Sequence, residues 1–158
     1  MDTPIKKAYG LALRYLSIRQ RTLLEMNDYL LKKGFTAQDV ARVVQQLMDE
    51  NYLNDRLFAQ NYLENRKRNK PKSLFAFRYE LERKGIDRHI MDELLTEYDD
   101  LELAFLAVES KIRQWQHLEA ASFKKKVFRF LQYRGFGFAA IQSTWQKIFD
   151  SHPDPDLE

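Results

Sequence analysis

Three glycines at nearly equal intervals constrain the fold of this chain more than any other feature. Gly34, Gly85 and Gly135 lie 51 and 50 residues apart. Each ends the same local phrase: a leucine lies four positions before the glycine, a lysine or arginine directly precedes it, and a bulky apolar residue follows it. A period of this size indicates a chain built from repeated structural units.

The residues around each glycine predict the end of one helix and the start of the next. Glycine ends a helix because it adopts the left-handed conformation without a Cβ clash. An apolar residue directly after the glycine and another five positions further on have the spacing of a hydrophobic staple, which fixes the entry of the following helix. The staple pairs are Phe35 with Val40, Ile86 with Met91, and Phe136 with Ile141, and the expected N-caps are Thr36, Asp87 and Gly137.

A further helix precedes each glycine, and another one opens each unit. Thr22 and Glu25 have the spacing of a capping box, and we expect Ser73 and Ser122 to cap the corresponding helices. The opening helices are predicted at about residues 5–18, 55–68 and 101–115. The sequence therefore predicts an all-α fold of three tandem three-helix repeats, arranged as an elongated, curved row.

The predicted boundaries follow from these helices. They place the first three-helix repeat at residues 1–52, the second at 53–98 and the third at 99–150. Residues 151–158 hold two prolines among acidic residues, and we expect them to form an acidic disordered tail.

The sequence offers little of the chemistry that catalysis requires. It contains no cysteine, and its three histidines are isolated from one another, so we expect no metal site. None of the five glycines belongs to a phosphate-binding loop or a nucleophile elbow. We predict that the protein is not an enzyme and needs no cofactor.

The chain also lacks an apolar segment of the length that targeting or membrane insertion requires. The N-terminal residues have no signal-peptide core, and no uncharged run is long enough to cross a bilayer. We expect a cytoplasmic monomer with no membrane partner.

Charge is distributed unevenly along the chain, although the net charge is only +3. Residues 87–110 hold one arginine and eight acidic residues, whereas residues 111–134 hold seven lysines and arginines and one acidic residue. Such blocks predict separate acidic and basic surfaces.

Two basic segments are candidates for binding DNA or a protein partner. The first holds five cations and no acid within seven positions, and its Pro71 disfavours helix at Lys70, which predicts a kinked or looped segment. It could bind phosphates or serve only as a solvated connector, and the sequence leaves both open. Its candidate residues are Arg66, Lys67, Arg68, Lys70 and Lys72.

The second basic segment lies on the helix before the last glycine. Several of its cations fall on one helical face, opposite the apolar residues, and binding there would weaken steeply with salt. Its candidate residues are Lys124, Lys125, Lys126, Arg129 and Arg134. Tyr133 and Phe138 flank the same glycine, and we expect both to be partly exposed. Stacking on bases is conceivable, but we expect the two rings to pack within the repeat.

Four segments, taken together, resemble the RecX family of bacterial recombinase regulators. Asn51-Tyr52-Leu53-Asn54-Asp55-Arg56-Leu57-Phe58-Ala59, with Tyr62 and Arg66 after it, is similar to the most recognisable segment of that family. The other three are Leu81-x-x-Lys84-Gly85-Ile86, Phe130-Leu131-x-x-Arg134-Gly135-Phe136 with Ile141, and Thr22-x-x-Glu25 with Leu30. The sequence departs from the family pattern at residues 69–73, where many members carry glycines.

The resemblance implies a non-enzymatic regulator that lies in the groove of the filament formed by the RecA recombinase on single-stranded DNA. Such a protein inhibits strand exchange and the accompanying ATP hydrolysis, and its partners are the filament and single-stranded DNA, with weak binding to duplex DNA conceivable. Two other functions stay open: a nucleic-acid-binding helical repeat protein that acts without a recombinase, and a protein scaffold whose charges serve solubility alone.

Overall fold

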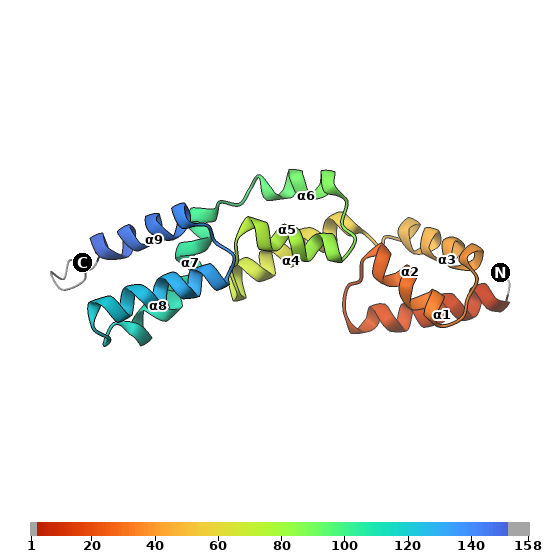
Figure 1. Ribbon diagram of the computed structural model, residues 1–158. Helices are drawn as coiled ribbons and strands as arrows, with labels where there is room; N and C mark the ends of the chain where they lie inside the picture. Colours follow the sequence, from red (N-terminus) through yellow and green to blue (C-terminus); the bar gives the residue numbers. More distant parts are fainter. Residues whose placement is uncertain (1–2, 152–158) are drawn as a thin grey trace. The chain divides into compact units, whose positions relative to one another are not determined.

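The computed structural model describes residues 3–151, and these residues form nine helices and no strand (Figure 1). This confirms the predicted all-α class with three tandem three-helix units. The boundaries between the units and the elongated, curved row stay predictions. In chain order the helices are α1 (Thr3–Ile18), α2 (Leu23–Lys32), α3 (Ala37–Asp49), α4 (Asp55–Asn69), α5 (Leu74–Arg83), α6 (Arg88–Leu95), α7 (Asp100–Trp115), α8 (Ala120–Tyr133) and α9 (Phe138–Ser151).

The chain divides into two compact units that do not coincide with the sequence repeats. The first comprises the residues up to Asn61 together with Leu81–Met91, and the second comprises Tyr62–Glu80 together with the residues from Asp92 onward. Helices α4, α5 and α6 therefore each contribute residues to both compact units.

Each compact unit has an apolar core at one set of three helices. In the first, α1, α2 and α3 pack against one another around Leu30 and Leu47, which are both fully buried. In the second, α7, α8 and α9 pack against one another, and Trp145 makes an edge-on contact with Phe123, with ring centroids 5.6 Å apart. The aromatic edge adds to the stabilisation that burial provides.

The three repeat glycines have the predicted conformation. Their φ angles are 96° at Gly34, 84° at Gly85 and 90° at Gly135. At each turn the glycine N–H and the N–H after it donate back into the preceding helix, for example from Phe35 to the carbonyl of Leu30 and from Gly34 to the carbonyl of Leu31. This pair of bonds is the Schellman motif, and it satisfies two carbonyls that the helix end leaves open.

Most of the predicted N-caps are present. Thr22 and Glu25 form the complete capping box, and the side chains of Thr36, Ser73 and Asp87 accept hydrogen bonds from the first turns of their helices.

The prediction for Ser122 was wrong, because α8 begins earlier, at Ala120, with Glu119 at the N-cap position. Ala120 and Ala121 favour helix strongly and extend it toward the N-terminus. The Ser122 hydroxyl donates instead to the Glu119 carboxylate, at 3.2 Å. At the other end, Ser151 is the last residue of α9 rather than the first of the tail. The remainder of the predicted tail lies outside the described residues.

The same hydrogen bond links consecutive repeats at two places. The backbone N–H of Leu23, the first residue of α2, donates to Oδ1 of Asp55, the first residue of α4, at 2.9 Å. The N–H of Leu74, which begins α5, donates to Oδ1 of Asp100, which begins α7, at 2.8 Å. A carboxylate at a helix N-terminus satisfies an open N–H and interacts favourably with the helix dipole. Helices α2 and α5 are thus each partly capped by the next repeat.

Close contact at the glycine turns accompanies these bonds. A Cβ added at Gly85 would lie 2.6 Å from Cβ of Leu24 in α2, and a Cβ added at Gly135 would lie 2.6 Å from Oγ of Ser73. At Gly34, which has no preceding repeat, nothing lies within 4 Å of the added atom. The second and third glycines therefore permit both a left-handed turn and a close approach to the preceding repeat.

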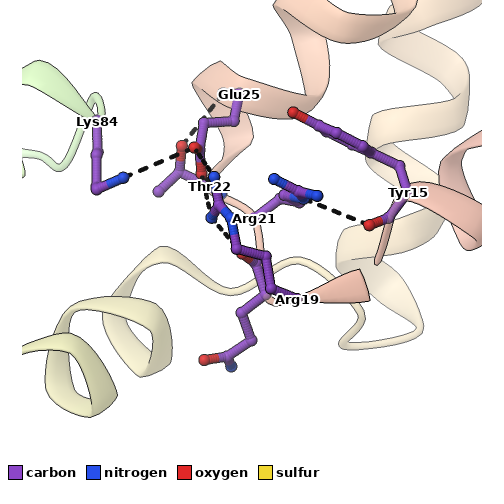
Figure 2. Close-up of polar contacts among 7 residues, drawn as sticks. Tyr15, Arg19, Arg21, Thr22, Glu25 and Lys84 are labelled. Carbon is purple, nitrogen blue, oxygen red and sulfur yellow. Dashed lines mark hydrogen bonds and ion pairs between the residues drawn. The ribbon is translucent and has the colours of Figure 1, made fainter. Parts of the chain in front are cut away.

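Glu25 connects three segments of the first compact unit (Figure 2). Its carboxylate accepts from the backbone N–H of Thr22 at 3.0 Å and pairs with Arg19 at 2.7 Å and with Lys84 at 3.8 Å. Burial raises the pKa of Glu25, but the bonds from Arg19 and Thr22 and the charge of Lys84 outweigh it and hold the pKa below its usual value. The ionised form therefore stabilises the fold.

Replacing the repeat glycines by alanine should separate the cost of the left-handed turn from the cost of the close approach to the preceding repeat. Gly34→Ala introduces only the strain of a left-handed alanine and should cost about 1 kcal/mol. Gly85→Ala adds the clash with Leu24 and should cost about 2–4 kcal/mol. Urea denaturation followed by circular dichroism measures the difference. Equal losses for the two variants would contradict the close approach at Gly85.

The charge of Glu25 predicts a pH dependence. Because its folded-state pKa is lowered, its contribution is complete above the unfolded value of about 4.3 and disappears as the pH falls through the folded value. Glu25→Gln keeps a capping acceptor and should lower the free energy of unfolding by about 1 kcal/mol at pH 7. That loss should become smaller as the pH is lowered from 7 to 3. The exposed Glu82→Gln serves as the control, and an equal loss at both pH values would refute the ionic role of Glu25.

Candidate nucleic-acid and partner interface

The first basic segment lies partly on a helix and partly in a connection. Helix α4 continues to Asn69, so Arg66, Lys67 and Arg68 are in its last turn. Lys70, Pro71 and Lys72, with Ser73 after them, form the connection to α5, and the looped segment expected around Pro71 is correspondingly short. The three cations at the end of α4 also interact favourably with the helix dipole.

The five cations of this segment differ in their surroundings. Lys67 pairs with Glu102 at 2.9 Å, and this bond raises the pKa of Lys67. Lys72 pairs with Glu80 at 2.8 Å. Arg66 lies over the ring of Tyr62, at 5.1 Å from the ring centroid, whereas Arg68 and Lys70 are exposed. Because their charged groups face solvent, these last two are the most accessible cations of the segment.

Arg134, from the second basic segment, holds the connection in place. Its Nη1 donates to the carbonyl of Pro71 at 2.9 Å, and its own carbonyl accepts from the N–H of Ser73 at 3.1 Å. Its guanidinium also lies over the ring of Phe130, at 4.6 Å. Burial lowers the pKa of Arg134, but a guanidinium stays charged at neutral pH. The C-terminal end of α8 is thus tied to the start of α5.

Arg134 lines two hollows, and both lie within the second compact unit. One, of about 340 Å³, is lined on its basic side by Lys67, Arg68 and Arg134. The other, of about 410 Å³, is lined by Lys70, Lys72, Phe75, Tyr79, Tyr133 and Arg134, among others. The structure therefore brings most of the first basic segment together with Arg134.

The remaining cations of α8 line neither hollow. Lys124 lies over the rings of Phe128 and Trp145, at 5.7 and 5.8 Å, and Lys126 lies 5.7 Å from the ring centroid of Trp115. Lys125 and Arg129 are exposed, one helical turn apart. These residues form a second basic surface on α8.

The expectation that Tyr133 and Phe138 pack within the repeat was wrong. Tyr133 is 87% exposed and Phe138 is 71% exposed. They flank the turn at Gly135, and the core position there is taken by Phe136, which is buried. Because the staple needs only Phe136 and Ile141, the two flanking rings have no place in the core.

Sequence reasoning also missed Phe75 and Tyr79 on α5. Phe75 is 77% exposed and Tyr79 is 55% exposed, whereas Phe77 and Leu81 are fully buried. The spacing of these residues could have indicated their exposure. Residues four apart share a helix face, and residues 75 and 79 lie on a different face from residues 77 and 81. Because α5 has apolar residues throughout, its sequence alone did not show that its aromatic residues lie on two different faces.

Within residues 3–151 no group of acidic or histidine side chains is arranged to hold a metal ion. None of the helices in this range is both long enough and apolar enough to span a bilayer.

The bonds of Arg134 predict that it is needed for stability. Arg134→Ala removes the hydrogen bond to Pro71 and should lower the free energy of unfolding by about 1–2 kcal/mol. The exposed Arg129→Ala should change it by less than about 0.5 kcal/mol. Urea denaturation provides the comparison, and similar values for the two variants would show that Arg134 does not hold the connection.

Comparison with known proteins identifies the family. The sequence models of the first, second and third three-helix domains of RecX match residues 8–47, 54–95 and 97–145. The regulatory protein RecX of Chlorobium limicola is 32% identical over 97% of this chain and 96% of its own length. That of Pelodictyon phaeoclathratiforme is 33% identical over 98% of this chain and 97% of its own.

A solved structure agrees with this relationship. The crystal structure of RecX from Lactobacillus salivarius matches with a TM-score of 0.76 and 26% identity, covering 92% of this chain and 96% of that one. The relatives are named regulatory proteins rather than enzymes. From the three domain matches and from relatives that align over nearly their whole length, we conclude that this chain belongs to the RecX family of regulatory proteins.

Proposed function

We propose that the protein binds the filament of RecA on single-stranded DNA and inhibits strand exchange and the accompanying ATP hydrolysis. The observation that carries this proposal is the relationship to regulatory RecX proteins over almost the whole chain. A regulator of this kind acts by occupying a surface, and it needs no catalytic group of its own. The sequence supports this, because it lacks the motifs of the common nucleotide and metal sites.

The proposed mechanism uses the uneven charge of the chain. The connection after α4 and the exposed face of α8 present cations to DNA phosphates or to acidic recombinase surfaces. The acidic stretch of residues 87–110 faces basic recombinase loops or solvent. By covering the filament, the protein blocks the approach of duplex DNA and promotes disassembly.

Exposure and pairing divide the ten candidate cations into three groups. Arg68, Lys70, Lys125 and Arg129 are exposed, and we assign the contacts with the filament to them first. Lys67, Lys72 and Arg134 hold internal partners at 2.8–2.9 Å and position the surface. Arg66, Lys124 and Lys126 lie near aromatic rings, and we assign them a secondary contribution of charge, although Lys126 is also exposed.

Charge reversal of the exposed cations tests the assignment. Arg68→Glu with Lys70→Glu, and separately Lys125→Glu with Arg129→Glu, should raise the concentration for half-inhibition of RecA ATP hydrolysis and strand exchange by about tenfold. Inhibition by the unmodified protein should occur below one molecule per recombinase subunit.

The matched control makes the same change of charge elsewhere. Arg42→Glu with Arg88→Glu reverses two exposed cations on α3 and α6 and should leave inhibition within about twofold of the unmodified protein. Full inhibition by both test variants would show that these basic surfaces do not make the contacts with the filament. Inhibition only when the protein coats all the DNA would favour a nucleic-acid-binding protein that acts without a recombinase partner.

A further inference from the structure

Three exposed aromatic rings gather around one hollow of the second compact unit. Phe75 and Tyr79 lie one turn apart on α5, Tyr133 ends α8, and all three line the hollow of about 410 Å³. Phe75 and Tyr133 leave 77% and 87% of their surface to solvent. Large apolar side chains exposed together, rather than singly, mark a surface that binds something.

The backbone beneath these rings is fixed. The N–H of Ser73 donates to the carbonyl of Arg134 at 3.1 Å, and the Arg134 side chain bonds back to Pro71. Gly135 lies so close to Ser73 that an added Cβ would be 2.6 Å from its Oγ. Phe75 and Tyr133 therefore extend from two segments that are bonded to one another, and a ligand need not order the backbone that carries them.

The charge around the rings selects an anionic ligand. Lys70, Lys72 and Arg134 line the hollow, and the carboxylate among its lining residues, Glu80, is already paired with Lys72 at 2.8 Å. Lys70 is exposed, and a guanidinium has five N–H donors, of which the bond to Pro71 uses one. Cationic charge therefore remains available beside the rings.

Single-stranded nucleic acid is the ligand that matches both features. Its phosphates interact with cations while its unpaired bases stack on aromatic faces. A duplex hides those base faces inside its stack, and an acidic peptide offers charge without a flat apolar face. The combination of exposed rings and neighbouring cations thus favours a single strand over both.

We propose that this surface, defined by Lys70, Phe75, Tyr79, Tyr133 and Arg134, binds free single-stranded DNA or RNA by base stacking on Phe75 and Tyr133. Binding at this surface does not require the recombinase. The protein would then bind nucleic acid directly, in addition to making the filament contacts proposed above.

Binding of a labelled oligothymidine, measured by fluorescence anisotropy without recombinase, tests the proposal. Phe75→Ala and Tyr133→Ala should each weaken binding about tenfold. Tyr52→Ala removes an exposed tyrosine of the other compact unit and should leave the affinity unchanged. The slope of log affinity against log salt should stay the same in the ring variants, because the rings release no counterions, and should decrease in Lys70→Glu.

A conservative variant separates stacking from a structural role. Phe75→Trp should retain binding, and oligothymidine should quench the fluorescence of the new indole, because it stacks on a base. The protein's own Trp115 and Trp145 are buried, and their contribution to the fluorescence is measured with the unmodified protein. The same oligonucleotide in duplex form should produce no such quenching.

Three results would overturn the proposal: no detectable binding of oligothymidine by the unmodified protein, undiminished binding by both alanine variants, or no quenching in Phe75→Trp. If the alanine variants bound DNA normally yet failed to inhibit RecA, the rings would belong to a protein interface instead. Because the DNA measurement contains no recombinase, its failure leaves the filament proposal standing, and the inhibition assay tests that proposal separately.

Discussion

A carboxylate from the next repeat, placed at the start of a second helix, is the interaction on which the repeat-to-repeat arrangement depends. Asp55 accepts from the N–H of Leu23, and Asp100 accepts from the N–H of Leu74, at nearly the same distance. At both places a glycine turn comes into close contact with the preceding repeat, which explains why Gly85 and Gly135 tolerate no Cβ while Gly34 has room for one. The recurring phrase therefore encodes the joint between repeats as well as the end of a helix.

The candidate surface is formed by the contact between the second and third repeats. Arg134 ends the phrase before the third glycine, and its bonds to Pro71 and Ser73 bring the end of α8 to the connection between α4 and α5. That connection carries Lys70 and Lys72. A residue that holds the fold together thus also gathers cations and aromatic rings from two repeats onto one surface, and the first joint has a different set of side chains around Glu25.

Sequence reasoning reached the helices, the turns and the basic segments because these depend on local chemistry. The left-handed glycines and the Thr22 capping box follow from residues within one turn of each other. It could not reach the pairing of Lys67 with Glu102 or the bond from Arg134 to Pro71, since the latter joins residues 63 positions apart. It also expected Tyr133 to pack within the repeat, whereas the ring is exposed and Phe136 is buried at that turn, because an aromatic residue alone does not reveal which face it occupies.

The central claim is that the connection after α4 and the exposed face of α8 make the contacts with the recombinase filament on which inhibition depends. Hydrogen–deuterium exchange of the protein on RecA–single-stranded DNA filaments tests it most directly. The account predicts slower exchange on binding in residues 66–79 and 124–138, with no change in α3. Protection confined to α3 and α6, with the basic segments exchanging as in the free protein, would contradict it.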